Sequence, residues 1–449
     1  MRKRLYIGLI INCLLLSGVR AQVLTLDSCL QLARQNNPTL KQAELGVKRA
    51  EQVKMQMLTK YFPQVQGTGF GFHALEPIVE VGIDDVNNAD VRDILNTLYE
   101  RFGKDLGLDR SVTMFHYGYI FGVTAVQPVF MGGKIISSNQ LAKVGVESAR
   151  VKSDIATRDA LEQVEQTYWL LYGLQRKQTI INDVNLLLDT LTQVVEASVE
   201  AGLALPSDLT YVQIRRDAVQ RQQLQLLSAQ RLARQALGLA IGIPITDSLV
   251  LADSLVVEEL TAVSPQTTIT PEANLLALQV RAVELEKVMV LADALPQIAV
   301  GANYSYGKWQ TNIKDSQWWG RDTGNGSVFL TLKVPLTAWW ETGHKLKEKQ
   351  YALEQAQIQQ EYVGAQLELR TQQAYDQVLE AQALLVIQER TATRAQDLYF
   401  QTLAFYEAGM ATITQLMQAQ TELTQAQIEW TDAQIAYRMY VKRYEDLCL

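Results

Sequence analysis

Apolar side chains recur at intervals of three and four positions near the end of this chain, the period of a packed α-helix. One heptad series places large apolar residues seven positions apart, at Leu416, Leu423, Trp430, Tyr437 and Tyr444. A second series fills the intermediate positions with Ala419, Ala426, Ala433 and Tyr440. A hydrophobic repeat of about 3.5 residues predicts coiled-coil packing against helices of the same or of adjacent chains. The other faces are rich in Gln, Ala, Glu and Thr, which favours a wetted tube of helices over a solid rod.

Two spans are free of proline for far longer than an ordinary globular helix requires. The first covers residues 134–200 and the second covers residues 343–407. Because nothing in either span breaks the backbone ladder, each can form one helix of about 100 Å at about 1.5 Å per residue. The pattern predicts an extended helical body rather than a catalytic cleft.

Shorter segments alternate with a period of two and have one apolar or aromatic face and one small, polar face. They cover residues 298–307, 327–336 and 115–125, and residues 64–72 alternate less clearly because of their glycines. Runs of about ten such residues are typical of transmembrane barrel strands around a wet lumen. The alternative is an ordinary sandwich strand. It is disfavoured by aromatic side chains near the strand ends, as in an interfacial girdle, namely Phe115, Tyr117, Tyr119, Tyr304, Tyr306, Trp309, Trp339 and Trp340.

The chain repeats itself. Pro128 and Tyr168 recur 207 residues later as Pro335 and Tyr375, and the triplet Glu-Ala-Gly that ends at Gly202 recurs with the same offset. We therefore expect two structural repeats per chain. The predicted organisation is a first repeat at 22–238 (β-hairpin 64–127, long helix 134–200, returning helix 207–238), an equatorial linker at 239–270, and a second repeat at 271–449 (β-hairpin 297–336, long helix 343–407, returning helix 413–445).

The first residues have the pattern of a secretory signal. Arg2, Lys3 and Arg4 precede an apolar run at residues 5–16, and small residues around Ala21 predict cleavage before Gln22, so that residues 1–21 are removed. We expect an exported protein. Lipidation is disfavoured, because Cys13 lies inside the apolar run and Cys29 follows Asp-Ser.

The mature chain would be acidic, with 37 basic residues against 48 acidic ones and a net charge of about −11. This balance argues against nucleic acid as a partner. Its apolar runs fall short of the roughly 18 residues of a membrane helix, so we expect any membrane crossing to use strands. Cys29 and Cys448 could pair in an oxidising compartment, and two small apolar side chains are the equally weighted alternative.

Four predicted strands per chain have a consequence for assembly. Open sheet edges cannot face hydrocarbon, and bacterial barrels begin at about eight strands. Two copies would give eight strands and a filled interior, whereas three would give twelve strands and room for a channel. We predict a homotrimer.

Several segments together resemble the TolC family of outer-membrane efflux proteins. They are LTLDSCLQLARQNNPTL near the start, YFPQV before the first strand, QPVFMGGK after the second, and the paired EAGLALPSDL and EAGMATITQL. The likeness runs from about Leu24 to about Tyr444. It implies an α+β membrane protein in which a trimer forms a twelve-stranded outer-membrane β-barrel, four strands per chain, continued by a twelve-helix periplasmic α-barrel. Residues 238–270 correspond to the family's equatorial region between the repeats.

The resemblance also implies partners and assigns roles to the two helical turns. The partners are a periplasmic membrane-fusion adaptor, an inner-membrane transporter and outer-membrane lipid. The residues expected at the periplasmic tip, where the adaptor docks, are Gly202, Leu203, Leu209, Gly409, Met410 and Leu416. The glycines are also helix C-caps, and the apolar residues are also expected to pack between helices.

Four residues are expected at the gate of the duct. Asp208 matches an acidic position of the family, and three copies around one opening would attract cations. Its alternative role is to stabilise a helix N-terminus. Tyr406 matches a tyrosine that holds the closed tip in relatives. Gln415 and Gln418 replace acidic residues of some relatives, which predicts a less cation-selective gate.

The first hairpin is 26 residues longer than the second, and Val91, Ile94, Leu95 and Leu98 within it have helical spacing. We expect a short helix there that covers or frames the external mouth. Residues 74–111 hold nine acidic and four basic side chains.

Catalytic, cofactor and metal motifs are lacking. The only histidines are His73, His116 and His344, and none lies in a metalloprotease, redox or nucleotide-binding pattern. We expect no enzyme, no cofactor and no metal centre. Two functions remain, a passive exit duct of a tripartite efflux or secretion system whose helix tips realign to open, and a periplasmic coiled-coil scaffold or adaptor without a pore.

Overall fold

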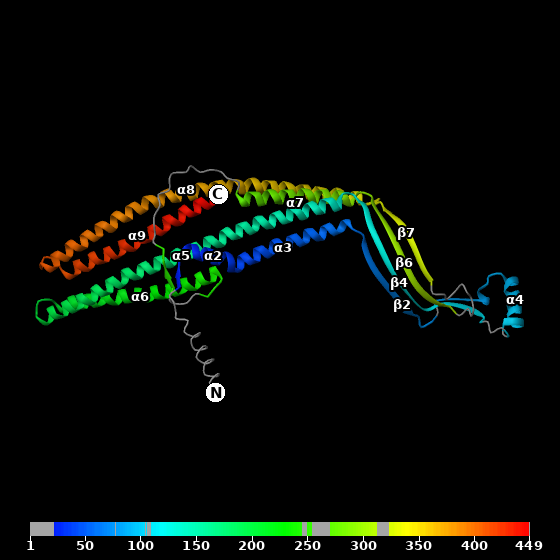
Figure 1. The fold of residues 1–449 in the computed structure, drawn as a ribbon, viewed down its shortest axis with the longest axis horizontal. Coiled ribbons are helices and arrows are strands. Elements are labelled where there is room, and N and C mark those ends of the chain that lie inside the picture. Colours follow the sequence, from blue (N-terminus) through cyan, green and yellow to red (C-terminus); the bar gives the residue numbers. More distant parts are fainter. Residues whose placement is uncertain are drawn as a thin grey trace, which may run out of the picture. The chain divides into compact units, whose positions relative to one another are not determined.

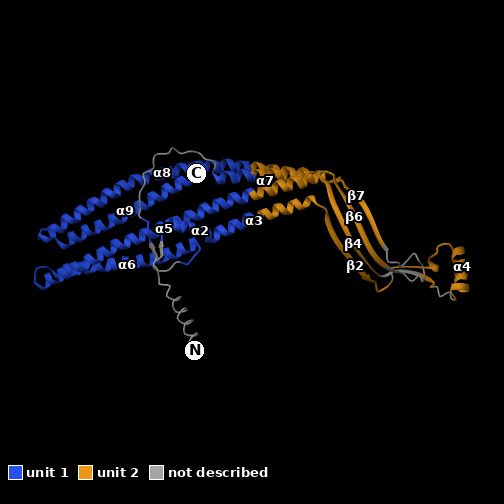
Figure 2. Ribbon diagram, viewed as in Figure 1, with its two compact units in different colours: residues 1–49, 147–279, 356–449 blue, residues 50–146, 280–355 orange. Residues whose placement is uncertain are grey.

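The computed structural model describes residues 22–76, 78–103, 105, 109–244, 249–253, 270–311 and 323–448. The expected signal segment and most of the expected linker lie outside them. Within this part of the chain, no helix combines the length and the apolar character needed to cross a membrane. The chain divides into two compact units, residues 1–49, 147–279 and 356–449 in one and residues 50–146 and 280–355 in the other. Each unit therefore takes segments from both sequence repeats (Figure 2).

Long helices make up most of the described chain (Figure 1). Those of the first repeat are α2 (Leu26–Asn36), α3 (Pro38–Leu58), α5 (Lys134–Glu200) and α6 (Pro206–Ile241). Those of the second are α7 (Pro271–Asp293), α8 (Ala338–Glu407) and α9 (Ile413–Cys448). α5 has 67 residues and α8 has 70, without interruption. α8 begins five residues earlier than expected, so Trp339 and Trp340 lie in its first turn.

Local chemistry fixes where the helices begin. Pro38, Pro206 and Pro271 each occupy the first helical position, where a missing N–H costs nothing. Asn37 precedes α3, and its side-chain oxygen accepts a hydrogen bond from the Thr39 N–H at 2.7 Å. These starts follow from the sequence alone.

The main sheet is antiparallel, with the order β2-β4-β6-β7. The strands are β2 (Gln64–His73), β4 (Ser111–Met131), β6 (Gln297–Thr311) and β7 (Thr323–Lys333). A fifth, short strand that the sequence did not reveal, β3 (Val79–Gly82), pairs with the start of β4. The expected hairpin end at residue 127 is too early, because β4 continues through Pro128 to Met131. The register shifts between Pro128 and Phe130, and such a bulge is where a strand tolerates a residue without an N–H.

Side chains on the two faces of this sheet differ in polarity. The register places Val65, Ala125, Ala302 and Val328 in one row across all four strands. The adjacent row, on the other face, is Gln66, Thr124, Asn303 and Ser327. In that row the Asn303 amide donates to Thr124 Oγ1 at 2.8 Å. In these two rows the predicted alternation is confirmed, with apolar side chains on one face and hydrogen-bonding ones on the other.

Helix packing in the first unit follows the predicted heptads. Leu416, Leu423, Tyr437 and Tyr444 are buried, and Trp430 packs against the same cluster as Leu416. That cluster draws on α5, α6, α8 and α9, and therefore on both repeats. The heptad prediction is confirmed.

A second hydrophobic cluster surrounds Tyr168 and Trp169 of α5, and the first described residues of the chain pack into it. Strand β1 (Gln22–Leu24) pairs in parallel with β5 (Leu249–Leu251). Just after β5, the Asp253 carboxylate accepts the Leu26 N–H at 2.6 Å and the Tyr168 hydroxyl at 2.8 Å. This one carboxylate therefore caps α2 and joins it to α5.

Candidate functional site at the helical turns

The turns from α5 to α6 and from α8 to α9 have the same backbone geometry. Gly202 and Gly409 adopt φ of 74° and 71°, the left-handed conformation that favours glycine. The amides after each helix end reach back in the Schellman pattern. Gly202 donates to the Val199 carbonyl at 3.0 Å and Leu203 to that of Ser198 at 2.8 Å, and the residues 207 positions later make the same bonds at the same distances. The predicted glycine C-caps are confirmed.

Both returning helices begin with a side chain that hydrogen-bonds the backbone. The Asp208 carboxylate accepts the Leu205 N–H at 3.2 Å. In the second turn Gln415 Oε1 accepts the Thr412 N–H at 2.8 Å, and Thr412 Oγ1 accepts the Gln415 N–H at 3.3 Å. Asp208 and Gln415 therefore occupy equivalent positions and share a capping role, although only Asp208 is charged. The helix-stabilising role weighed for Asp208 is present in the structure.

Tyr406 brings the two turns into electrostatic contact. Its ring packs against the cluster that contains Leu416. Burial, and then the negative charge of Asp208, raise the pKa of the Tyr406 hydroxyl above its ordinary value. The carboxylate of one turn thus acts on the phenol of the other. Two of the predicted gate residues lie near each other within a single chain.

Gln418 is the fourth predicted gate residue and is exposed on α9. Its amide donates to Glu422 Oε1 at 2.9 Å, one turn further along the same helix. Gln418 and Gln415 therefore both make contacts within their own hairpin.

The predicted apolar tip residues divide into exposed and buried groups. Leu203 is 85% exposed and Met410 is 71% exposed. Leu416 is 0% exposed and Leu209 packs against the same cluster, so these two hold helices together. Sequence reasoning missed further exposed apolar side chains, Leu205, Ile214 and Phe405. The apolar residue before the proline that starts α6 was the available signal for Leu205.

The two cysteines lie in different clusters. Cys29 is fully buried beside Tyr168 and Trp169, and Cys448 packs beside Tyr444. No disulfide joins Cys29 to Cys448 in the structure. Burial raises the pKa of the Cys29 thiol to about 11, which keeps it protonated and unreactive near neutral pH.

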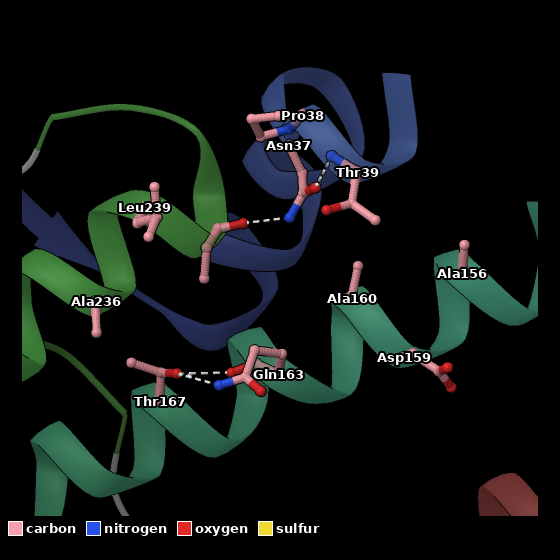
Figure 3. A pocket seen from close by; sticks show the side chains of 11 residues that line it. Asn37, Pro38, Thr39, Ala156, Asp159, Ala160, Gln163, Thr167, Ala236 and Leu239 are labelled. Carbon is pink, nitrogen blue, oxygen red and sulfur yellow. Dashed lines mark hydrogen bonds between the residues drawn. The ribbon is translucent and has the colours of Figure 1, made fainter. Parts of the chain in front are cut away.

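A cavity of about 750 Å³ lies away from the turns, between the α2–α3 junction, α5 and the end of α6 (Figure 3). Small side chains such as Ala156, Ala160 and Ala236 line much of it. The polar side chains at its wall are engaged locally, since Asn37 donates to the Ala240 carbonyl at 2.6 Å. It offers apolar space rather than convergent ligands. Among the residues described here, no cluster of three or more His, Cys, Asp and Glu could hold a metal ion.

Residues 275–440 match the family model described as "Outer membrane efflux protein". No curated protein matches the chain at a significant level. Solved structures of the same fold cover nearly the whole chain. A membrane protein from Pseudomonas aeruginosa has a TM-score of 0.75 at 15% identity, covering 94% of this chain and 93% of that one.

Two outer membrane channels are also similar. The Campylobacter jejuni CmeC channel has a TM-score of 0.74 at 14% identity, with 94% of this chain and 85% of that chain covered. The open state of the Neisseria gonorrhoeae MtrE channel has a TM-score of 0.72 at 14% identity, with 96% and 93% covered. These matches confirm the predicted resemblance and the α+β fold of the single chain, whereas the homotrimer stays a prediction.

Proposed function

We propose that this chain, whose residues 275–440 belong to the outer membrane efflux protein family, is one subunit of a trimeric exit duct in the bacterial outer membrane. Three copies share a barrel of twelve strands, four from each chain, and their helices continue it as a tube into the periplasm. The duct is passive. An inner-membrane transporter, linked through a periplasmic adaptor, supplies the energy.

The sheet is the observation that carries this proposal. Within the described residues β2 and β7 pair on one side only, so each leaves a row of N–H and C=O groups open. β2 and β7 run antiparallel to each other, and copies placed edge to edge would continue one antiparallel ladder. Because unpaired backbone groups cost several kcal/mol in hydrocarbon, the exposed apolar face requires such closure.

The helical turns form the gate of this duct. Three copies of Asp208 surround the periplasmic opening and favour cations there. Tyr406 of the neighbouring hairpin stays close to each Asp208 while the tip is closed. Opening separates the two hairpins by realigning long helices, a shift between two packed arrangements.

The adaptor docks at the exposed apolar side chains of the same turns. Leu203, Leu205 and Met410 leave large apolar area in water beside polar and charged neighbours. A patch of this kind is typical of an interaction surface. Leu209 and Leu416 support it from beneath.

Planar-bilayer recording tests the duct directly. The mature protein, extracted in detergent, should run as a trimer that dissociates on heating, and the trimer should conduct ions. A water-soluble protein that never inserts or conducts would instead be a periplasmic scaffold and would overturn the proposal.

A further inference from the structure

Helix α4 (Ala89–Leu98) exposes a continuous apolar stripe. Val91, Ile94, Leu95 and Leu98 follow the spacing i, i+3, i+4, i+7 of one helix face, and they are between 37% and 59% exposed. No residue of α4 is buried. A short helix with this pattern is stable in proteins because something covers its apolar face.

Hydrogen bonds hold α4 to the end of the main sheet. β3 extends the ladder, with Gly82 opposite Ser111 at the start of β4. Arg110 then donates to Asp84 Oδ1 at 3.5 Å and to Asn96 Oδ1 of α4 at 3.1 Å. The other end of β4 is followed directly by α5. α4 is therefore carried at the end of β4 opposite to the start of α5, which is the external end of the proposed duct (Figure 1).

The charge of the segment argues against lipid as the cover. Residues 74–111 carry nine acidic and four basic side chains, so an anionic lipid surface would repel them. Copies of the chain are the better candidates. The open edges of β2 and β7 already require further copies, and each copy brings its own α4 to the same end. The stripe also has the spacing with which helices pack on one another.

We propose that three α4 helices, one from each chain, associate through their apolar stripes and form a cap over the external mouth of the duct. This inference rests on the proposed trimeric duct and adds a second, external constriction to it. An apolar constriction hinders ions, because it disfavours the water that accompanies them. The cap is thus a barrier to entry from outside.

Cysteine cross-linking in the intact trimer tests the contact. Ile94→Cys places a thiol on the stripe, and Asp93→Cys places one on the other side of the same helix, with the native cysteines unchanged in both. Mild oxidation should convert Ile94→Cys to covalent dimers, since each thiol can bond only one partner. The yield of covalent dimers should be at least about fivefold higher for Ile94→Cys than for Asp93→Cys. Equal linking of both variants, or none of either in a stable trimer, would overturn the cap but leave the duct intact.

A matched pair of charge variants tests the effect of the proposed cap on ion conductance. Ile94→Glu adds three carboxylates to the shared seam, whereas Ala89→Glu adds three at the helix N-terminus, away from the stripe and where a negative charge is tolerated. Single-channel conductance should rise at least about twofold for Ile94→Glu and stay unchanged for Ala89→Glu. Equal conductance of the Ile94→Glu and Ala89→Glu variants would overturn the proposal that the cap is a barrier to ions. Protection of Ile94→Cys from a maleimide only when lipopolysaccharide is present would overturn it in favour of lipid. A wild-type protein that is not trimeric would instead refute the proposed function itself.

Discussion

At the scale of single residues, the two turns share a capping side chain but differ in its charge. Asp208 and Gln415 occupy equivalent positions and both accept a backbone N–H, yet only Asp208 contributes to the potential of the proposed gate. The capping role of Gln415 was foreseeable, because Thr412-Ile413-Thr414-Gln415 has the spacing of a capping box. The proximity of Tyr406 to Asp208 was not foreseeable from spacing, since it depends on how two hairpins pack.

This equivalence gives a prediction about ion selectivity. Asp208→Asn keeps an oxygen for the cap and removes one negative charge per chain, and Gln415→Glu keeps the cap and adds one. Reversal potentials in a salt gradient should therefore show cation selectivity falling severalfold for Asp208→Asn and rising for Gln415→Glu. The double variant should lie near the wild type. If both single variants kept the wild-type reversal potential, Asp208 would have no role at the gate.

At the scale of elements, the sequence predicted the features that depend on residues close together in the chain. The long proline-free spans predicted α5 and α8, and the heptad pattern predicted which face of α9 is buried. Contacts distant in sequence were missed. The pairing of β1 with β5 joins segments about 227 residues apart, and the extension of β4 past Pro128 depends on a bulge opposite β6. Nothing within either segment encodes such a partner.

The hydrogen bond from Tyr168 to Asp253 should contribute measurably to the stability of the junction between α2 and α5. Tyr168→Phe removes a hydrogen bond to a carboxylate, worth about 1.5–3 kcal/mol, while Asp253 still caps α2. Amide hydrogen exchange in α2 should accelerate by about tenfold or more. Tyr172→Phe, one turn along α5, is the matched control and should leave exchange in α2 unchanged. Equal acceleration in the two variants would mean that loss of any hydroxyl from this cluster loosens α2.

The same junction predicts a response to alkaline pH. Burial, and then the contact with Asp253, raise the pKa of the Tyr168 hydroxyl well above its ordinary value near 10. Because the unfolded chain loses this proton first, the stabilisation is complete below about pH 10 and is lost as pH rises through the folded pKa. Thermal unfolding, followed by circular dichroism in detergent, should therefore depend less steeply on pH above 10 in Tyr168→Phe than in the wild type. Parallel pH profiles would contradict the assignment.

At the scale of the whole molecule, the proposed duct requires the two faces of the sheet to meet two different solvents, lipid and water. Leu330 and Thr331 are adjacent on β7 and point to opposite faces, Leu330 beside Val300 and Thr331 on the face that already carries Lys333. If the apolar face meets lipid, Leu330→Lys places a charge in hydrocarbon at a cost of about 2–4 kcal/mol, whereas Thr331→Lys places it in the wet lumen at little cost.

The two lysine variants therefore form a matched pair that differs only in the face of the strand. Leu330→Lys should reduce the yield of heat-modifiable trimer in the outer membrane severalfold, and Thr331→Lys should assemble normally and shift ion selectivity away from cations. The reverse outcome would mean that the sheet is inside out relative to this proposal. Equal tolerance of both would mean that neither face meets hydrocarbon, in which case the open edges of β2 and β7 would no longer require a closed ring of copies.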